Sequence, residues 1–182
     1  MAKVILLIPS LFNLKMSLQR LSSKRVDIQL STLENALHFI SDIVVNEFKI
    51  TLDFDNLDSD LLHIKQYYDK DNGGCFWVVE QIDNYQIIGT VAIRKLIQFT
   101  STAELKRMFL SKPYRGLGIR QIMLDTAINF AKKLDYSEIF LYSSKDLTVS
   151  RILYIKNGFI DILRYNDDHR ADVFMKKTIR YQ

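Results

Sequence analysis

The part of the sequence that most limits the possible folds is residues 104–120, where a strand pattern turns through two glycines directly into a helix pattern. Gly116 and Gly118 carry no Cβ, so the chain can bend there and successive backbone N–H groups can converge on one anion at the start of a helix. Three cationic side chains flank the bend: Lys112, Arg115 and Arg120. The pattern predicts a cradle for a diphosphate, although glycine also occurs where a strand merely bends into a helix.

Hydrophobic periodicity predicts the elements on either side of this bend, with a period of two for strands and about 3.6 for helices. The predicted strands are residues 26–30, 76–82, 87–97, 103–110, 138–142, 159–164 and 172–179. The predicted helices are residues 33–48, 57–68, 119–134 and 148–157. Ser31 to Glu34 has the form of a capping box for the first helix. Helices that interrupt a mainly antiparallel strand series predict an α+β fold of three layers, with the sheet covered on both faces.

Length and charge distribution indicate one domain with a basic extension. The chain has 182 residues, 48% of them apolar, which suffices for one core but not for two typical domains. The first 25 residues hold five basic side chains and no acidic ones, which leaves 20 basic against 21 acidic residues in the rest. We therefore expect residues 1–24 to be a poorly ordered or loosely docked extension and residues 25–182 to be the domain. The extension could be a transit segment, a misassigned start, with Met16 as a second candidate, or a docked arm.

The composition excludes several classes of protein. The apolar run at residues 4–12 is too short to span a bilayer, and the near-neutral body argues against nucleic-acid binding outside the extension. The single cysteine, Cys75, can form no disulfide within the chain, which suits the reducing cytoplasm. His38, His63 and His169 lie too far apart for zinc-ligand spacing, so no metal is expected.

Several separate motifs resemble the GNAT family of acetyltransferases over roughly residues 25–180. Arg115 to Arg120 is similar to the family's phosphate motif, Arg/Gln-x-x-Gly-x-Gly/Ala, but has Arg120 in place of the last small residue. Tyr154 to Phe159 is similar to its Tyr-x-x-x-Gly-Phe signature. Residues 103–110 resemble its fourth strand, and the loss of alternation near Arg107 is typical of a β-bulge. Leu147 stands where the family often has asparagine, so one cofactor contact is in doubt.

The resemblance implies a GNAT fold in which the fourth and fifth strands splay apart around acetyl-CoA, the co-substrate. Unpaired amides near Met108 and Leu110 would bind the pantetheine arm and the thioester carbonyl, where they stabilise the oxyanion that develops. The implied cofactor-binding residues are Met108, Phe109, Leu110, Arg115, Gly116, Leu117, Gly118, Ile119 and Arg120. Arg120 is interpreted as an added cationic contact to phosphate, although it could instead crowd the cradle.

Two residues are candidates for catalysis by direct attack of an amine on the thioester. Tyr154 matches a family tyrosine near the cofactor sulfur and could protonate the leaving thiolate, or it could be an ordinary core aromatic. Glu104 matches the general-base glutamate of the histone-modifying branch, or it could pair with a neighbouring charge.

The acceptor is expected to be a primary amine of a small molecule or peptide. Four carboxylates precede or begin the second predicted helix: Asp53, Asp55, Asp58 and Asp60. They could form an acidic mouth that attracts a cationic amine, or simply cap the helix.

The function expected from the sequence is an N-acetyltransferase, a monomer or homodimer, without nucleic-acid or membrane partners. The alternatives are an acyl-CoA sensor without turnover and an adaptor that acts through the basic extension. Simple nucleotide binding is disfavoured because the P-loop lysine-hydroxyl pair is missing.

Overall fold

The centre of the molecule is a mixed sheet of seven strands in the order β1-β2-β3-β4-β5-β7-β6. The computed structural model describes residues 6–8, 30–81 and 84–179. The strands are β1 (Leu6–Ile8), β2 (Cys75–Gln81), β3 (Ile87–Lys95), β4 (Thr102–Leu110), β5 (Glu138–Ser143), β6 (Ile160–Asp161) and β7 (Val173–Thr178). Neighbouring strands run antiparallel except for the β1–β2 and β4–β5 pairs, which are parallel.

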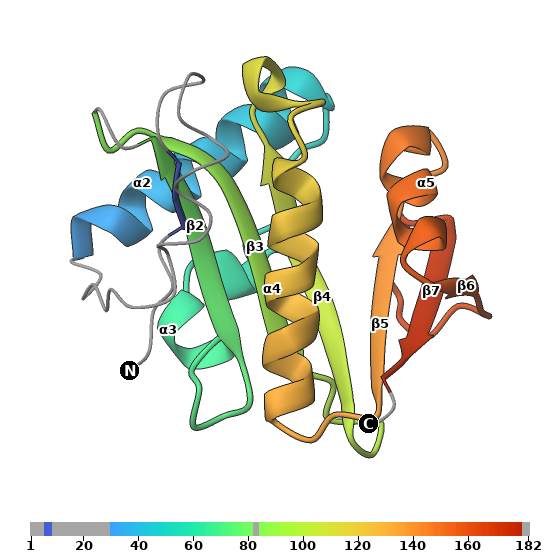
Figure 1. Cartoon of the computed structure of the whole chain (residues 1–182). Helices are drawn as coiled ribbons and strands as arrows, with labels where there is room; N and C mark the ends of the chain where they lie inside the picture. Colours follow the sequence, from blue (N-terminus) through green and yellow to red (C-terminus); the bar gives the residue numbers. More distant parts are fainter. Residues whose placement is uncertain (1–5, 9–29, 82–83, 180–182) are drawn as a thin grey trace.

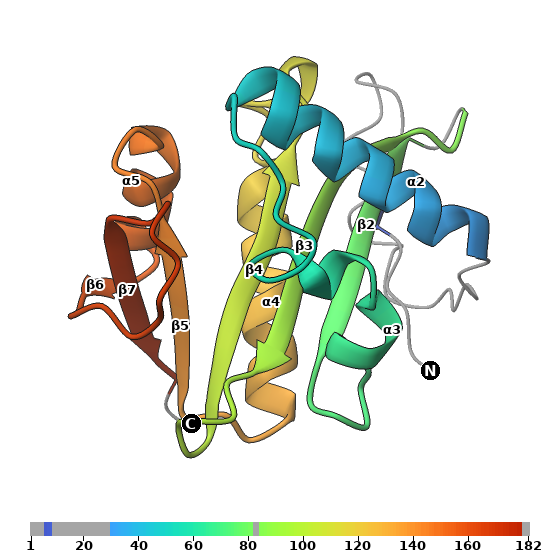
Figure 2. The ribbon, with the colours of Figure 1, turned by 180° about the vertical axis from the view of Figure 1, so that it is seen from behind.

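Helices cover both faces of this sheet. One face carries α2 (Leu30–Ser41), its continuation η1 (Asp42–Glu47), the short turn η2 (Ser59–Leu61) and α3 (Ile64–Tyr67), as Figure 2 shows. The opposite face carries α4 (Ile119–Lys133), which follows the short turn η3 (Lys112–Tyr114), and α5 (Thr148–Lys156) (Figure 1). Two separate hydrophobic clusters fill the layers, and the sheet lies between them. The predicted three-layer α+β fold is confirmed.

The strands β4 and β5 diverge soon after they meet. Their parallel register holds for only three residue pairs, from Thr102 opposite Glu138 to Glu104 opposite Phe140. Beyond this point β4 continues to Leu110 and β5 to Ser143, but the two strands no longer pair with each other (Figure 1). The splay between the fourth and fifth strands, expected from the resemblance, is therefore present.

A β-bulge interrupts β4 just beyond the last residue that pairs with β5. Ala92 of β3 pairs with Lys106, whereas Thr90 pairs with Phe109, so β4 contains one residue more than β3 over this stretch. Arg107 has a φ of 54°, and its carbonyl accepts a hydrogen bond from Thr90 Oγ1 at 2.8 Å. The bulge predicted from the broken alternation is confirmed.

The structure corrects several predicted element boundaries. The helix expected at residues 57–68 is broken into η2 and α3, with a non-helical residue, His63, at the N-cap of α3. The strand expected at residues 159–164 is reduced to β6, which has two residues. Ser31 lies inside α2 instead of capping it, because that helix begins at Leu30.

The predicted strand at residues 26–30 lies outside the described residues except for Leu30, which is helical. Most of the basic extension also lies outside them. Three of its residues form β1 beside β2, with Leu6 opposite Val79, a pairing that the sequence pattern did not predict.

Candidate active site

A cavity occupies the space between the diverging strands. Its walls are formed by residues 105–110 of β4, residues 141–143 of β5, η1 with the residues that follow it, and the first turns of α5. Of the predicted cofactor-binding residues, five line it: Met108, Phe109, Leu110, Arg115 and Arg120. The cavity therefore reaches Arg115 and Arg120, which flank the glycine bend. The other predicted residues, Gly116, Leu117, Gly118 and Ile119, do not line it.

The glycine bend forms an anion site at the start of α4. Gly116 and Gly118 have φ values of 80° and 79°, a conformation that residues with a Cβ rarely adopt. A Cβ at either position would meet nothing within 4 Å, so the requirement for glycine is conformational. The backbone N–H groups of residues 116–120 have no acceptor in the described part of the chain. Such unpaired donors at a helix N-terminus suit a phosphate group.

Arg115 and Arg120, two of the cations predicted beside the bend, differ in how far protein groups already pair with their charge. Arg115 donates from Nε to the carbonyl of Leu110 at 2.9 Å and pairs with Glu47 at 2.6 Å, so part of its charge is compensated. The hydrogen bond from Arg115 lowers the pKa of Glu47. Arg120 makes one long hydrogen bond, 3.3 Å from Nη1 to Ser150 Oγ. Burial, and then the charge of Arg115, lower the pKa of Arg120, as expected for a cation without a paired carboxylate.

Backbone donors of β4 face the cavity. Ser111 N–H donates to the carbonyl of Ile88 on β3 at 2.9 Å. Because N–H groups alternate in direction along a strand, the N–H of Leu110 points away from β3, toward the space that opens beside β5. Phe109 pairs with Thr90 of β3, so the same alternation directs the N–H of Met108 toward this space.

Tyr154 lies on the cavity wall, on α5. Its side chain is 8% exposed, packs against Phe159, and places its hydroxyl 3.8 Å from the Met108 sulfur. Burial raises the pKa of Tyr154 to about 12, so the phenol stays protonated at neutral pH. Leu147, the N-cap residue of α5, also lines the cavity, at the position where the family often has asparagine.

Glu104 is buried and lies outside the residues that line the cavity. Its Oε2 accepts from Arg94 Nε at 2.7 Å and from Arg94 Nη2 at 2.6 Å. Its Oε1 accepts from the hydroxyl of Tyr165 at 2.9 Å. Both oxygens are therefore engaged, which favours the charge-pairing role over that of a base, with Arg94 as the partner.

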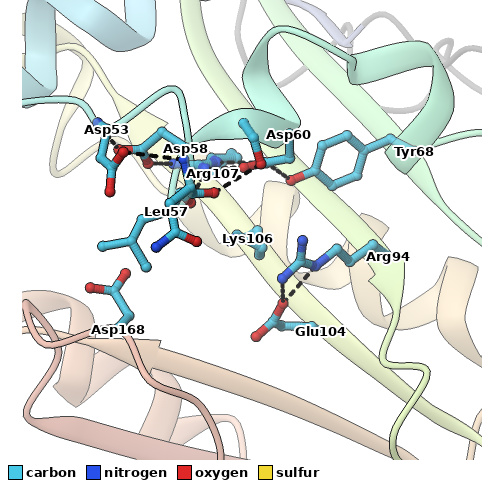
Figure 3. Close-up of polar contacts among 12 residues, drawn as sticks. Asp53, Leu57, Asp58, Asp60, Tyr68, Arg94, Glu104, Lys106, Arg107 and Asp168 are labelled. Atoms are coloured by element: carbon cyan, nitrogen blue, oxygen red, sulfur yellow. Dashed lines mark hydrogen bonds and ion pairs between the residues drawn. The ribbon is translucent and has the colours of Figure 1, made fainter.

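The carboxylates that were expected to form an acidic mouth divide into two groups. In the loop before η2, Asp55 is exposed and Asp53 is half-buried, whereas Asp58 and Asp60 are 1% and 2% exposed. Figure 3 shows that Asp58 and Asp60 converge on Arg107. Neither of these two carboxylates caps a helix with its side chain. Both are paired with arginine, so neither is free to attract a cationic amine. For Asp58 and Asp60, the acidic-mouth and the helix-cap interpretations are therefore both wrong.

The Asp58–Asp60 cluster is closed by further partners. Arg107 Nη1 donates to Asp58 at 2.8 Å, and Arg107 Nε donates to Asp60 at 3.0 Å. Arg170 Nη1 binds the second oxygen of Asp58 at 2.8 Å, and the hydroxyl of Tyr68 donates to Asp60. Burial opposes the charge of Asp60, but the hydrogen bond and charge of Arg107 hold its pKa well below the ordinary value.

A family model described as the acetyltransferase (GNAT) family matches residues 37–159, two thirds of the chain. The chain belongs to the GNAT family. The predicted membership of this family and the GNAT fold are thereby confirmed.

Relatives of this GNAT protein have a range of names. An N-acetylaspartate synthetase from Danio rerio is 33% identical over 103 residues, which is 57% of this chain and 36% of the relative. N-acetyltransferase 8F1 from Mus musculus is 30% identical over 106 residues, 57% of this chain and 47% of the relative. The chain thus spans about a third to a half of the length of these curated relatives.

Solved structures share the GNAT fold over most of the described chain. A GNAT acetyltransferase from Staphylococcus aureus Mu50 has a TM-score of 0.76 and 28% identity, covering 85% of this chain and 98% of its own. The PaiA N-acetyltransferase of Thermoplasma acidophilum, solved in complex with coenzyme A, has a TM-score of 0.61 and 18% identity, covering 85% and 97%. Among the described helices of this GNAT domain, none is long and apolar enough to cross a bilayer.

Some residues of the GNAT cavity were missed by sequence reasoning. Lys106 and Tyr142 contact each other across the splayed strands, and Asp168 and Arg170 line the cavity from the loop before β7. A signal existed for Lys106, because a lysine next to an arginine interrupts the alternation of the predicted strand. No local pattern marks Tyr142, Asp168 or Arg170, since their partners are distant in the sequence.

Proposed function

We propose that this protein is an N-acetyltransferase that transfers the acetyl group of acetyl-CoA to a primary amine. The observation that carries the proposal is the row of unpaired N–H groups at residues 116–120, which adjoins a cavity between two diverging strands. A diphosphate bound at this row would direct the pantetheine arm along β4 into that cavity. Membership of the GNAT family supports the same cofactor.

The reaction would proceed by direct attack of the neutral amine on the thioester carbonyl carbon. The C–N bond forms, the C–S bond breaks, the nitrogen loses one proton and the departing thiolate gains one. Backbone N–H groups of Met108 and Leu110, directed toward the cavity, would stabilise the negative charge on the carbonyl oxygen.

Tyr154 is the proposed acid for the thiolate. Its phenol borders the cavity beside Met108, and burial raises its pKa to about 12. An unperturbed thiol has a pKa of about 8.5, so the phenol is a weaker acid than the thiol that its proton would form. The proton must therefore move from the phenol to the sulfur while the C–S bond breaks and charge develops on the sulfur. For Glu104, the contacts with Arg94 and Tyr165 support charge pairing, so we assign the amine's proton to solvent in the open cavity.

The acceptor is proposed to be a small-molecule or peptide amine, and the site of action the cytoplasm, in keeping with the single cysteine. Because some relatives are named N-acetylaspartate synthetase, amino acids are the first amines to test.

The test combines binding with turnover. At an acetyl-CoA concentration of 100 times Kd, ligand binding should stabilise the fold by about 2.7 kcal/mol, seen as a higher Tm. A library of amino acids, polyamines, aminoglycosides and peptide N-termini should then contain an amine that drives release of free CoA thiol. No thermal shift at millimolar acetyl-CoA would reject the cofactor assignment. Binding without release for any amine would favour the alternative, an acyl-CoA sensor.

A further inference from the structure

Lys106 is a buried cation on the wall of the cavity. The residue is 7% exposed, and its Nζ donates to the hydroxyl of Tyr142 at 2.9 Å. No carboxylate oxygen of the described residues lies within 4.0 Å of this ammonium group. A lysine ammonium has three N–H donors, so two of them have no partner among the described residues.

The arginines around Lys106 are already neutralised. Arg94 pairs with Glu104, Arg107 with both Asp58 and Asp60, and Arg170 with Asp58 and Asp168. In Figure 3, Lys106 lies between the Arg107 cluster and the Arg94–Glu104 pair, with no dashed line to either. Asp60 and Glu104 therefore act on Lys106 only at longer range, because arginines and tyrosines occupy their oxygens.

This environment destabilises the charged form of Lys106. Burial, followed by the positive charges of Arg107 and Arg94, lowers the pKa of Lys106 to about 8, against the weaker opposing effects of Asp60 and Glu104. The ammonium form still predominates at pH 7. A buried charge is costly unless it is paired, so an anion that enters the cavity would find a favourable site here.

Lys106 lies where β4 and β5 separate, close to the proposed position of the thioester. Glu104 and Phe140 are the last paired residues of β4 and β5, and Lys106 and Tyr142 each lie two residues further. Their contact thus spans the base of the slot, where the strands separate. Met108, which contacts the Tyr154 hydroxyl, lies two residues beyond Lys106 on β4, a separation of about 6–7 Å along a strand.

We propose that Lys106 binds a carboxylate of the acceptor, so that the enzyme selects compact amines, such as amino acids, in which few bonds separate the amine from a carboxylate. This inference rests on the proposed acetyltransferase function and names its substrate class. Tyr142 positions the ammonium group by accepting one of its hydrogen bonds, and the two remaining donors face the ligand.

The test compares acids with their amides. With the full chain and saturating acetyl-CoA, kcat and KM are measured for aspartate, glutamate and alanine, and for alaninamide and spermidine. The wild type should favour alanine over alaninamide by roughly 30-fold or more in kcat/KM, since a desolvated charge pair is worth at least about that factor. Lys106→Met should abolish this preference, mainly through a higher KM for the acids, and leave kcat/KM for alaninamide within about threefold.

The controls separate specificity from folding. Lys95→Met removes an exposed lysine from β3 and should preserve the preference. Lys106→Arg should retain part of it. Should Lys106→Met fail to fold, the acid-to-amide ratio of the wild type decides the question.

Three outcomes would contradict the inference or its basis. Equal losses for acids and amides in Lys106→Met would show that Lys106 is structural. A wild type that prefers spermidine or alaninamide would overturn carboxylate selection and leave the acetyltransferase function intact. Binding of acetyl-CoA with transfer to no amine would reject the proposed function itself.

Discussion

Tyr154 illustrates how burial selects one proton-transfer role for a side chain. Within the cavity wall, desolvation raises the pKa of the phenol to about 12, and the charge of Arg120 only partly opposes this effect. The phenol is therefore protonated throughout the physiological range, so it can donate a proton to a thiolate but cannot serve as a base for the amine. The nearby sulfur of Met108 leaves its proton without a strong acceptor until a ligand arrives.

Replacing Tyr154 with phenylalanine should lower kcat by a factor of about 10² to 10⁴, the usual contribution of a positioned acid. The Kd for acetyl-CoA should change less than threefold, because the ring that packs against Phe159 remains. Steady-state kinetics and calorimetric titration measure the two quantities. Tyr67→Phe, at an exposed position, is the matched control. Unchanged kcat in Tyr154→Phe would remove the hydroxyl from the chemistry.

Arg120 tests whether the departure from the family motif strengthens or weakens the cradle. Its guanidinium makes one long hydrogen bond and lines the cavity, so a bound phosphate would supply a partner. Arg120→Gly should therefore weaken CoA binding by roughly 10- to 100-fold, the equivalent of a charged hydrogen bond. Arg120→Ala separates this loss from the helix-weakening effect of glycine. Tighter binding in both variants, measured calorimetrically, would show that Arg120 crowds the site.

For single residues, the sequence identifies local features better than distant ones. The glycine bend and Tyr154 were predictable because a turn and a helix-end signature lie within six residues of the chain. Lys106 and Tyr142 are 36 positions apart, and Arg107 and Asp60 are 47 apart. Their pairing depends on the register of whole strands, so the arginine partners of Glu104, Asp58 and Asp60 could not be assigned from the sequence.

Among the elements, β4 does the most to shape the site, through its bulge. Leu105 and Met108 face the cluster beneath α4, while Lys106 and Arg107 both face the side of η2 and the cavity. Strict alternation would have placed Arg107 on the same side as Leu105. Because of the extra residue, Arg107 can pair with the carboxylates of η2 and its N-cap while the adjacent Lys106 lines the cavity.

The turn η2 explains why a helix prediction over residues 57–68 was wrong. On a regular α-helix, residues two apart point about 200° away from each other, so Asp58 and Asp60 could not both reach Arg107. The broken turn brings both carboxylates to one guanidinium. The apolar spacing of this segment indicated helix, but the buried ion pairs determined its conformation.

Asp60→Asn should destabilise the fold by about 3 kcal/mol, because it removes one partner of a buried pair while Asp58 still holds Arg107. The folded pKa of Asp60 lies below its unfolded value of about 3.9. Its contribution is therefore complete above about pH 4 and is lost as the pH falls below it.

Urea unfolding at pH 7 and pH 3 measures both effects, and the difference between wild type and Asp60→Asn should shrink at the lower pH. Asp55→Asn, at an exposed position in the same loop, is the control and should be neutral. An Asp60→Asn protein as stable as the wild type at pH 7 would show that the pair does not hold η2 to β4.

The whole molecule consists of two sheet halves joined by a short seam. Strands β1 to β4 form one half and strands β5 to β7 the other, and the three residue pairs of β4 and β5 are the sheet contacts that connect them (Figure 1). The three layers followed from the order of the predicted elements. The position of the seam was expected from the family resemblance alone, because periodicity gives no information on where paired strands separate.

A ligand held by the start of α4 and inserted between β4 and β5 would contact both halves at once. Acetyl-CoA should therefore slow amide hydrogen exchange at residues 141–143 of β5 and in the first turn of α5, as well as at residues 116–120. Amides of β2, far from the cavity, should be unaffected and provide the control within the same experiment. Protection confined to residues 116–120 would mean that the nucleotide binds while the thioester stays outside the slot. That result would separate phosphate binding from catalysis, since the transfer requires the thioester to lie beside Met108 and Tyr154.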